Sequence, residues 1–167
     1  MTSIAKHSLH SSVREEYLEY IFLAQLCSYA WQTDQFVEVA RSHTDAFGYD
    51  LVLNCNGVTR HTQLKASVAE GSRTDQSVNV ALAGKESGCI VWMIVDPDTL
   101  IPQFFLWFGG KAGTPLPDLG DKLAKHTKGN AEGQKAERKN IRKLGKSKFE
   151  KLNSVGEVFS RLFEKGD

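Results

Sequence analysis

A single dipeptide, Asn56-Gly57, constrains the fold of this chain more than any other feature. It stands between two segments, 49–55 and 58–66, in which apolar and polar residues largely alternate. A two-residue hairpin turn of type I′ needs a positive φ at both central positions, and asparagine and glycine are the residues that best tolerate it. The pattern therefore predicts an antiparallel hairpin with its turn at Asn56-Gly57.

The turn also fixes which residues share a face of the hairpin. With Asn56 and Gly57 at the turn, Asp50 lies opposite Gln63, and Lys65 shares the face of Gln63 because side chains alternate across a strand. That face collects Asp50, Val52, Asn54, Thr59, His61, Gln63 and Lys65. The other face, which we expect to meet the core, collects Leu51, Leu53, Cys55, Val58 and Leu64 with Arg60 and Thr62. A slip of one residue in the pairing would separate Asp50 from its two neighbours.

The segments around the hairpin predict an α/β fold with a central mixed sheet. A helix is expected over 13–30, with a capping box at Ser12 and Glu15, and its apolar residues surround most of its circumference, which predicts a largely enclosed helix. Strands are expected at 36–40, 77–83, 90–95 and 103–108. Trp31, Trp92 and Trp107 lie in apolar segments and are expected in the core.

The C-terminal third of the chain is basic. Residues 111–151 carry 12 Lys and Arg against 5 Asp and Glu, whereas 1–110 carry 7 against 12. A helix predicted over 131–144 would align four basic residues in one stripe. A last helix, beginning at a capping box of Ser154 and Glu157, presents an apolar face that should dock on the core. The basic segment is expected either to hold phosphates or to form a solvated, lysine-rich surface.

Length and cysteine content exclude several classes of protein. A chain of 167 residues with 41% apolar residues can bury a core as one domain, so disorder and a disulfide miniprotein are not expected. The 3 cysteines are widely spaced and lack a metal-binding pattern, which favours a reduced, cytoplasmic protein without a zinc finger. No secretion signal or membrane span is expected, because Asp96, Pro97 and Asp98 interrupt the longest apolar stretch.

The polar face of the hairpin carries a combination suited to phosphodiester hydrolysis. A carboxylate, an amide and an ammonium group close together are costly to desolvate unless a ligand uses them. Mg²⁺ prefers hard oxygen ligands, which Asp50 and the side-chain carbonyl of Gln63 can offer. Lys65 can orient or deprotonate the attacking water and offset the charge that grows on phosphorus. A surface ion pair without catalytic function is the alternative interpretation.

From about Glu15 to Phe108 the sequence resembles the PD-(D/E)xK nuclease superfamily, in the D-x-x-G-x-D-L … Q-x-K-x-S form of its restriction-endonuclease-like and Mrr-like branches. The motif residues here are Asp45, Gly48, Asp50 and Leu51, then Gln63, Lys65 and Ser67. The resemblance implies an endonuclease that uses Mg²⁺ or Mn²⁺, with a first-helix glutamate as a further metal ligand. Glu19 is the best match for that glutamate, Glu16 lies close by, and a solvated helix charge is the alternative. Two departures stand out: Tyr49 replaces the proline of the motif, and the neutral Gln63 replaces an acid.

The resulting expectation is a nuclease-like α/β core over 1–110 and a basic helical extension over 111–167 packed on the same domain. Asp50, Gln63, Lys65 and Glu19 (or Glu16) form the expected catalytic and metal-binding group, with His61 either an accessory phosphate contact or an ordinary strand histidine. The expected phosphate-binding residues are Lys125, Lys128, Lys135, Arg138, Lys139, Arg142 and Lys146. DNA is favoured over RNA as the substrate, and a homodimer is left open because cutting both strands of a duplex generally needs two sites. The alternatives are a nuclease-fold module that binds nucleic acid without cleaving it, favoured by the missing acid at Gln63, and an interaction protein that uses its last helix.

Overall fold

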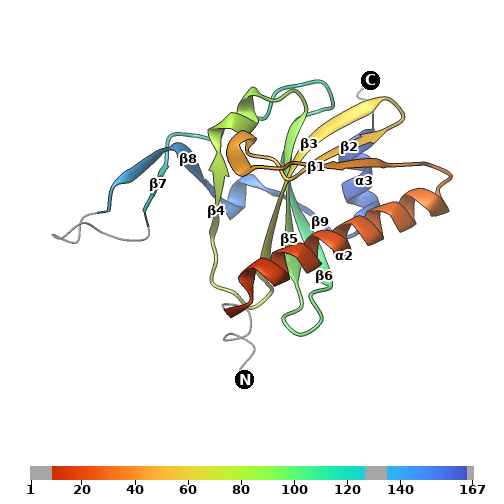
Figure 1. Cartoon of the computed structure of the whole chain (residues 1–167), viewed down its shortest axis with the longest axis horizontal. Coiled ribbons are helices and arrows are strands. Elements are labelled where there is room, and N and C mark those ends of the chain that lie inside the picture. The colour runs from red at the N-terminus through yellow and green to blue at the C-terminus, as the bar shows by residue number, and fades with distance from the viewer. Residues whose placement is uncertain (1–8, 127–134, 165–167) are drawn as a thin grey trace.

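The chain folds into a mixed six-stranded sheet with a second, three-stranded sheet and two helices, as the computed structural model shows for residues 9–126 and 135–164 (Figure 1). The first sheet has the order β1 (Glu38–Arg41), β2 (Leu51–Cys55), β3 (Val58–Val68), β5 (Gly88–Val95), β6 (Pro102–Gly109) and β9 (Glu150–Leu152). The second has the order β4 (Asp75–Asn79), β8 (Glu137–Gly145) and β7 (Leu123–Lys125). The helices are α2 (Ser11–Gln32) and α3 (Val155–Phe163), and short 3-10 turns are η1 (Asp45–Phe47), η2 (Val80–Gly84) and η3 (Lys146–Lys148). The predicted α/β class with a mixed sheet is confirmed.

The hairpin of β2 and β3 has the predicted turn and the predicted register. Asn56 and Gly57 have φ of 51° and 77°, as a type I′ turn requires. Pairing runs from Cys55 opposite Val58 to Leu51 opposite Thr62. The predicted core face is confirmed for six of its residues, which are all buried on the side of the hairpin that faces the helices. They are Leu51, Leu53, Cys55, Val58, Arg60 and Thr62. β3 also pairs with β5 in parallel, and this pairing makes the sheet mixed.

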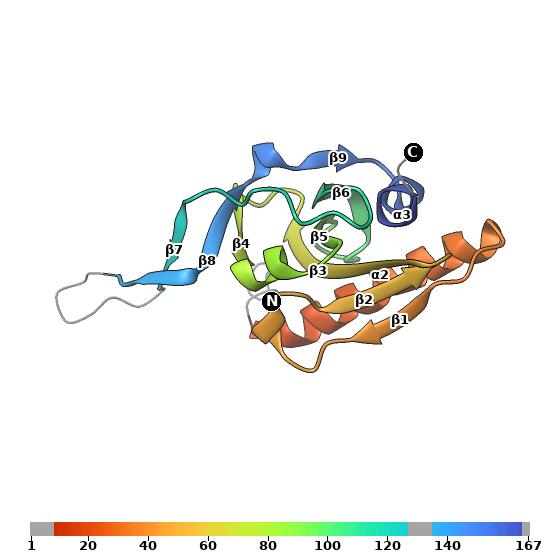
Figure 2. The same ribbon diagram turned by 90° about the horizontal axis from the view of Figure 1, so that it is seen from above.

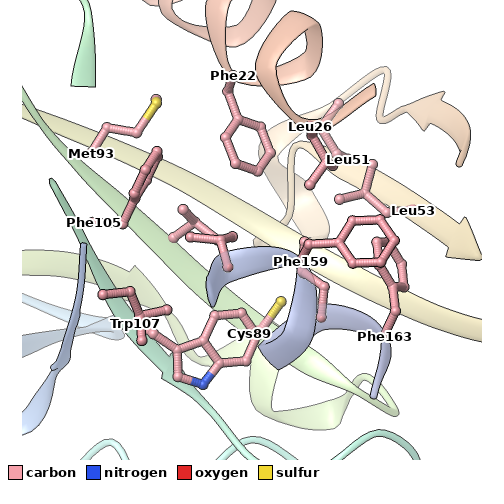
Figure 3. Packing of buried hydrophobic residues seen from close by; sticks show 14 of the residues in the cluster. Phe22, Leu26, Leu51, Leu53, Cys89, Met93, Phe105, Trp107, Phe159 and Phe163 are labelled. Carbon is pink, nitrogen blue, oxygen red and sulfur yellow. The ribbon is translucent and has the colours of Figure 1, made fainter. Parts of the chain in front are cut away.

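Two apolar clusters, one on each face, hold the six-stranded sheet in place. On one face, α2 and α3 pack through Phe22, Leu26, Phe159 and Phe163 onto the sheet (Figure 3). On the other face, Trp92 and other side chains of β5 and β6 pack against the second sheet, η2 and the segment around Phe149. Both faces are therefore covered, and β5 is buried along its whole length.

Two of the three tryptophans belong to these clusters, and the third is exposed to solvent. Trp92 and Trp107 are buried, as predicted. Trp31 is 75% exposed at the end of α2, so the prediction of a core position for it was wrong. Its ring contacts the ring of Phe36 edge-on, with 6.2 Å between the ring centroids, and does not pack on the sheet.

Two details of the first helix differ from the prediction. The helix begins at Ser11, and His10 at its N-cap makes no side-chain capping bond, so the predicted capping box at Ser12 and Glu15 was wrong. The helix is also not enclosed. Its buried positions form one stripe at every fourth residue, while its outer side faces solvent because only the sheet and α3 cover it. The buried residues of α2 are Leu18, Phe22, Leu26 and Ala30.

The prediction of a basic helix over 131–144 was also wrong for the residues of this range that the structure describes. Residues 137–145 form β8, which pairs with β4 on one side and with β7 on the other, and residues 131–134 lie outside the described part. Spacing of charges alone favoured a helix, whereas pairing with two distant segments determines the extended form. In a strand, consecutive side chains such as those of Arg138 and Lys139 point to opposite faces, so the four basic residues do not form one stripe.

The last helix forms as predicted. Ser154 accepts a hydrogen bond from the Glu157 amide at 3.2 Å, and the Glu157 carboxylate accepts one from the Asn153 amide at 2.9 Å. Its apolar face, which includes Val158 and Leu162, is buried on the chain's own core. That face is therefore not available to a partner protein. Within the described ranges, no helix is long and apolar enough to cross a bilayer.

A buried arginine joins the hairpin to α3. Arg60 is only 1% exposed, although it lies in β3 among apolar side chains. Its guanidinium donates hydrogen bonds to three main-chain oxygens, those of Leu162 at 2.7 Å, Arg161 at 2.8 Å and Gly110 at 3.1 Å. Two of these carbonyls belong to the C-terminal turn of α3, where the helix dipole is negative. Burial lowers the pKa of Arg60, so these contacts compensate for the cost of desolvating a cation.

Replacing Arg60 with methionine should lower the free energy of unfolding by about 3 kcal/mol or more, because it leaves three carbonyls unsatisfied. The matched control is Arg161→Met, which removes an exposed ion pair with Glu150 and should cost about 1 kcal/mol or less. Urea unfolding followed by circular dichroism measures both. Equal effects of the two substitutions would mean that Arg60 does not hold α3 in place.

Candidate functional site

A cleft of about 970 Å³ opens beside the second half of β3. It exists because β3 is longer than β2: pairing with β2 ends at Thr62, and among the described residues no strand continues along this edge. The first half of α2, the end of β1, the loop before β4, and parts of β4 and β8 surround it. All five residues of the predicted catalytic and metal-binding group line this one cleft: Glu16, Glu19, Asp50, Gln63 and Lys65.

Asp50 occupies the place where the partner strand of β3 would have continued. Gly48, with φ of 75°, turns the chain just before it. The Asp50 amide donates to the Thr62 carbonyl at 3.0 Å, and its carboxylate Oδ2 accepts a hydrogen bond from the Leu64 amide at 2.7 Å. The side chain thus satisfies a main-chain donor on the open edge, which fixes the carboxylate at the cleft.

Gln63 presents a buried acceptor that nothing in the described structure uses. The residue is 8% exposed, and its side-chain Oε1 is buried without a hydrogen-bond partner. An amide oxygen in this state is destabilising, because it has lost its water and gained no donor in exchange. Buried polar atoms are rarely left in this way, so the oxygen calls for an explanation in terms of a ligand.

Lys65 lies two residues farther along β3, half-buried, on the same face as Gln63. In the sheet it stands beside Trp92 of β5, as Gln63 stands beside Ile90. The register therefore brings the carboxylate, the amide and the ammonium to one cleft, as the sequence predicted.

The two glutamates of α2 line the cleft but already have contacts. Glu19 accepts a hydrogen bond from Arg41 at 2.5 Å, in an ion pair in which the glutamate side chain is 22% exposed. The Tyr20 hydroxyl donates to the carboxylate of Glu16, which raises the pKa of Tyr20. Arg41 therefore neutralises the glutamate that matches the expected metal ligand best.

The donor set fits one divalent cation only in part. Asp50, the Gln63 Oε1 and one glutamate supply oxygen, which suits Mg²⁺ or Mn²⁺. In the part of the chain that the structure describes, however, no three carboxylate, histidine or cysteine side chains gather as a metal-binding group. The partnerless Gln63 oxygen is the feature of this set that favours a cation.

Of the arginines that line the cleft, sequence reasoning identified Arg138 alone. Arg14, Arg41 and Arg73 line it together with Arg138. Arg14, Arg41 and Arg73 come from α2, from the end of β1 and from the loop before β4, and no motif marks them in the sequence. Their common position follows from the tertiary arrangement alone.

Of the predicted phosphate-binding residues that the structure describes, only Arg138 lines the cleft. Lys125 lies in β7, Lys139 and Arg142 lie in β8, and Lys135 precedes β8. Lys146 lies in η3, with its ammonium 6.0 Å from the Trp92 ring centroid. Lys128 lies outside the described residues.

His61 lies outside the cleft lining. Its Nδ1 is 3.0 Å from the Glu86 carbonyl, and its ring meets Tyr49 edge-on at 4.9 Å. These contacts agree with the interpretation of His61 as an ordinary strand histidine.

Comparisons of the chain with protein-family models, with curated proteins and with solved structures found no match.

The partnerless oxygen leads to a prediction about stability. Gln63→Met should raise the free energy of unfolding by about 1 kcal/mol or more, because it removes an unsatisfied buried acceptor at similar volume. Gln76→Met is the matched control. Gln76 is also a buried cleft residue, but it bonds to Ser67 and Arg73, so its loss should destabilise by about 1 kcal/mol. Thermal or urea unfolding measures the stability change of both variants. Destabilisation by both substitutions would mean that the side-chain oxygen of Gln63 has a hydrogen-bond partner.

Proposed function

We propose that this protein is a metal-dependent nuclease that hydrolyses phosphodiester bonds of DNA, on a restriction-endonuclease-like core. The observation that carries the proposal is the buried, partnerless oxygen of Gln63 between Asp50 and Lys65. A bound cation supplies the missing partner and so offsets the free-energy cost of burying that oxygen away from water. The motif over Asp50, Gln63 and Lys65 supports the same conclusion.

Asp50, Gln63 and a glutamate, Glu19 or Glu16, would hold Mg²⁺ or Mn²⁺. When bound, the ion supplies Lewis-acid stabilisation of the phosphate and its developing charge. The Leu64 amide fixes the carboxylate of Asp50, so this ligand needs little reorganisation. Arg41 pairs with the carboxylate of Glu19, and both residues line the cleft.

Lys65 has the role closest to the chemistry. Its ammonium group orients the attacking water, whose oxygen forms the new bond to phosphorus while the bond to the leaving oxygen breaks. The water gives up one proton to solvent, and the leaving oxygen takes up one proton from solvent. The same positive charge offsets the negative charge that accumulates on the phosphate oxygens in the transition state.

The second candidate is a nuclease-fold module that binds nucleic acid without cleaving it. Two observations favour it: Gln63 is neutral, and Arg41 already pairs with Glu19. Retention of Lys65 in the cleft favours catalysis, because binding alone does not require a lysine at this position. Cleavage assays separate the two candidates.

The first test is on Lys65. Wild-type protein should relax or cut supercoiled plasmid with Mg²⁺ or Mn²⁺ and lose this activity with EDTA, and Lys65→Ala should lower the rate by about 100-fold or more. Plasmid affinity should change little, because Lys65 acts mainly on the transition state. Lys111→Ala, an exposed lysine outside the cleft, is the control. Full activity of a folded Lys65→Ala protein contradicts the catalytic assignment, and no activity of wild type with any metal supports the binding module.

The second test is on the metal ligands. Gln63→Glu adds a charged oxygen and should tighten Mg²⁺ binding, whereas Asp50→Asn should weaken it by about tenfold or more. Gln76→Glu places a carboxylate elsewhere in the cleft and should not tighten binding to the same extent. Isothermal titration of the three variants against wild type measures this, and unchanged affinity in both Gln63→Glu and Asp50→Asn would contradict a metal at this site.

A further inference from the structure

A two-stranded ribbon of β7 and β8 projects from the body of the protein (Figures 1 and 2). Its root is held to β4, where Asp75 forms ion pairs with Lys143 at 2.9 Å and Lys122 at 3.6 Å. The hydrogen bond from Lys143 is the main cause that lowers the pKa of Asp75 below its ordinary value. Beyond this root the ribbon extends into solvent.

The ribbon is strongly basic. Its described residues, 122–126 and 135–143, include 7 Lys and Arg and a single acid, Glu137. Asp75 pairs with two of these cations. Within the described ranges the other five form no ion pair, and four of them are exposed, Arg142 being partly buried. These five are Lys125, Lys135, Arg138, Lys139 and Arg142.

Shape and charge together indicate what the ribbon contacts. We infer that the ribbon of β7 and β8 enters the major groove of duplex DNA, an inference that rests on the proposed function. Two paired strands are about 5 Å apart, and the major groove of B-form DNA, about 12 Å wide, admits such a ribbon with its side chains. Arg138 and Lys139 point to opposite faces, so cations can reach the phosphates of both walls of the groove.

The ribbon also connects to the catalytic cleft. Arg138 and Ile141 of β8 form part of the cleft lining, near the side chains of β3. The register of β7 on β8 shifts between Leu123 and Ala124, and such irregularities bend a ribbon. A duplex held by the ribbon therefore meets Arg138 at the entrance of the cleft, and the substrate of the proposed nuclease is double-stranded DNA.

Other nucleic acids fit this surface less well. Single-stranded DNA has no groove, and the major groove of A-form RNA is too deep and narrow for side chains to read. The inference therefore predicts a preference among three probes of one sequence: duplex DNA, single-stranded DNA and duplex RNA. Fluorescence anisotropy measures the affinity for each probe, with EDTA present to prevent cleavage. The protein should bind duplex DNA at least tenfold more tightly than single-stranded DNA or duplex RNA.

A charge-matched pair of variants locates the binding surface. Lys125→Gln with Lys139→Gln removes two ribbon charges, and Lys111→Gln with Lys151→Gln removes two charges outside the ribbon. The ribbon variant should flatten the slope of log affinity against log salt by about two units, whereas the control should leave it nearly unchanged. Dimethyl sulfate should show protection of guanine N7, which lies in the major groove, by wild type but not by the ribbon variant.

Each outcome either supports or overturns the inference. Any one of three results overturns the inference. These are equal affinity for the three probes, equal slopes of log affinity against log salt in the two variants, and protection of only the minor-groove N3 of adenine. Lys65→Ala should bind the duplex like wild type, which separates the two proposals. Ribbon-dependent duplex binding without cleavage contradicts only the proposed catalysis, and cleavage with unchanged binding by the ribbon variant contradicts only the ribbon.

Discussion

The register of the β2–β3 hairpin is the constraint on which the rest of the site depends. The type I′ turn at Asn56-Gly57 sets it, and pairing of Leu51 with Thr62 extends it to the point where β2 begins. This register lets Asp50 reach the Leu64 amide and brings it into the same cleft as Gln63 and Lys65, which share a face because they are two residues apart in β3. A shift of one residue in the pairing would separate Asp50 from Gln63 and Lys65.

The cleft arises from unequal strand lengths. β3 continues for six residues, 63–68, beyond its last pair with β2, and its open edge offers main-chain groups that a neighbouring strand would normally bond. Asp50 satisfies one of them, and α2 and the second sheet enclose the remainder. The same edge that weakens the sheet leaves room for the cleft. A buried oxygen without a partner, such as that of Gln63, is the kind of local instability that functional sites retain.

Charges have two separate functions in this architecture. Arg60 is a structural cation: it is buried, and it ties the hairpin to the C-terminal turn of α3 through main-chain oxygens. The exposed cations of the β7–β8 ribbon contribute nothing comparable to the core, since the ribbon leaves the body of the protein. Asp75 marks the boundary between the two, because it pairs with the lysines at the root of the ribbon, whereas the cations farther out have no acidic partner among the described residues.

The sequence alone determined the elements whose signals are local. Asn56-Gly57 predicts its turn because few residues tolerate positive φ, and Ser154 with Glu157 predicts the start of α3 because the two side chains bond amides within one turn. From the turn, alternation then predicts that Asp50, Gln63 and Lys65 meet. Only the tertiary structure decided that 137–145 is a strand, because its partners β4 and β7 lie far away in the sequence. It also decided which arginines line the cleft and that Arg41 pairs with Glu19, since such contacts depend on how separate elements pack and leave no periodic trace in the chain.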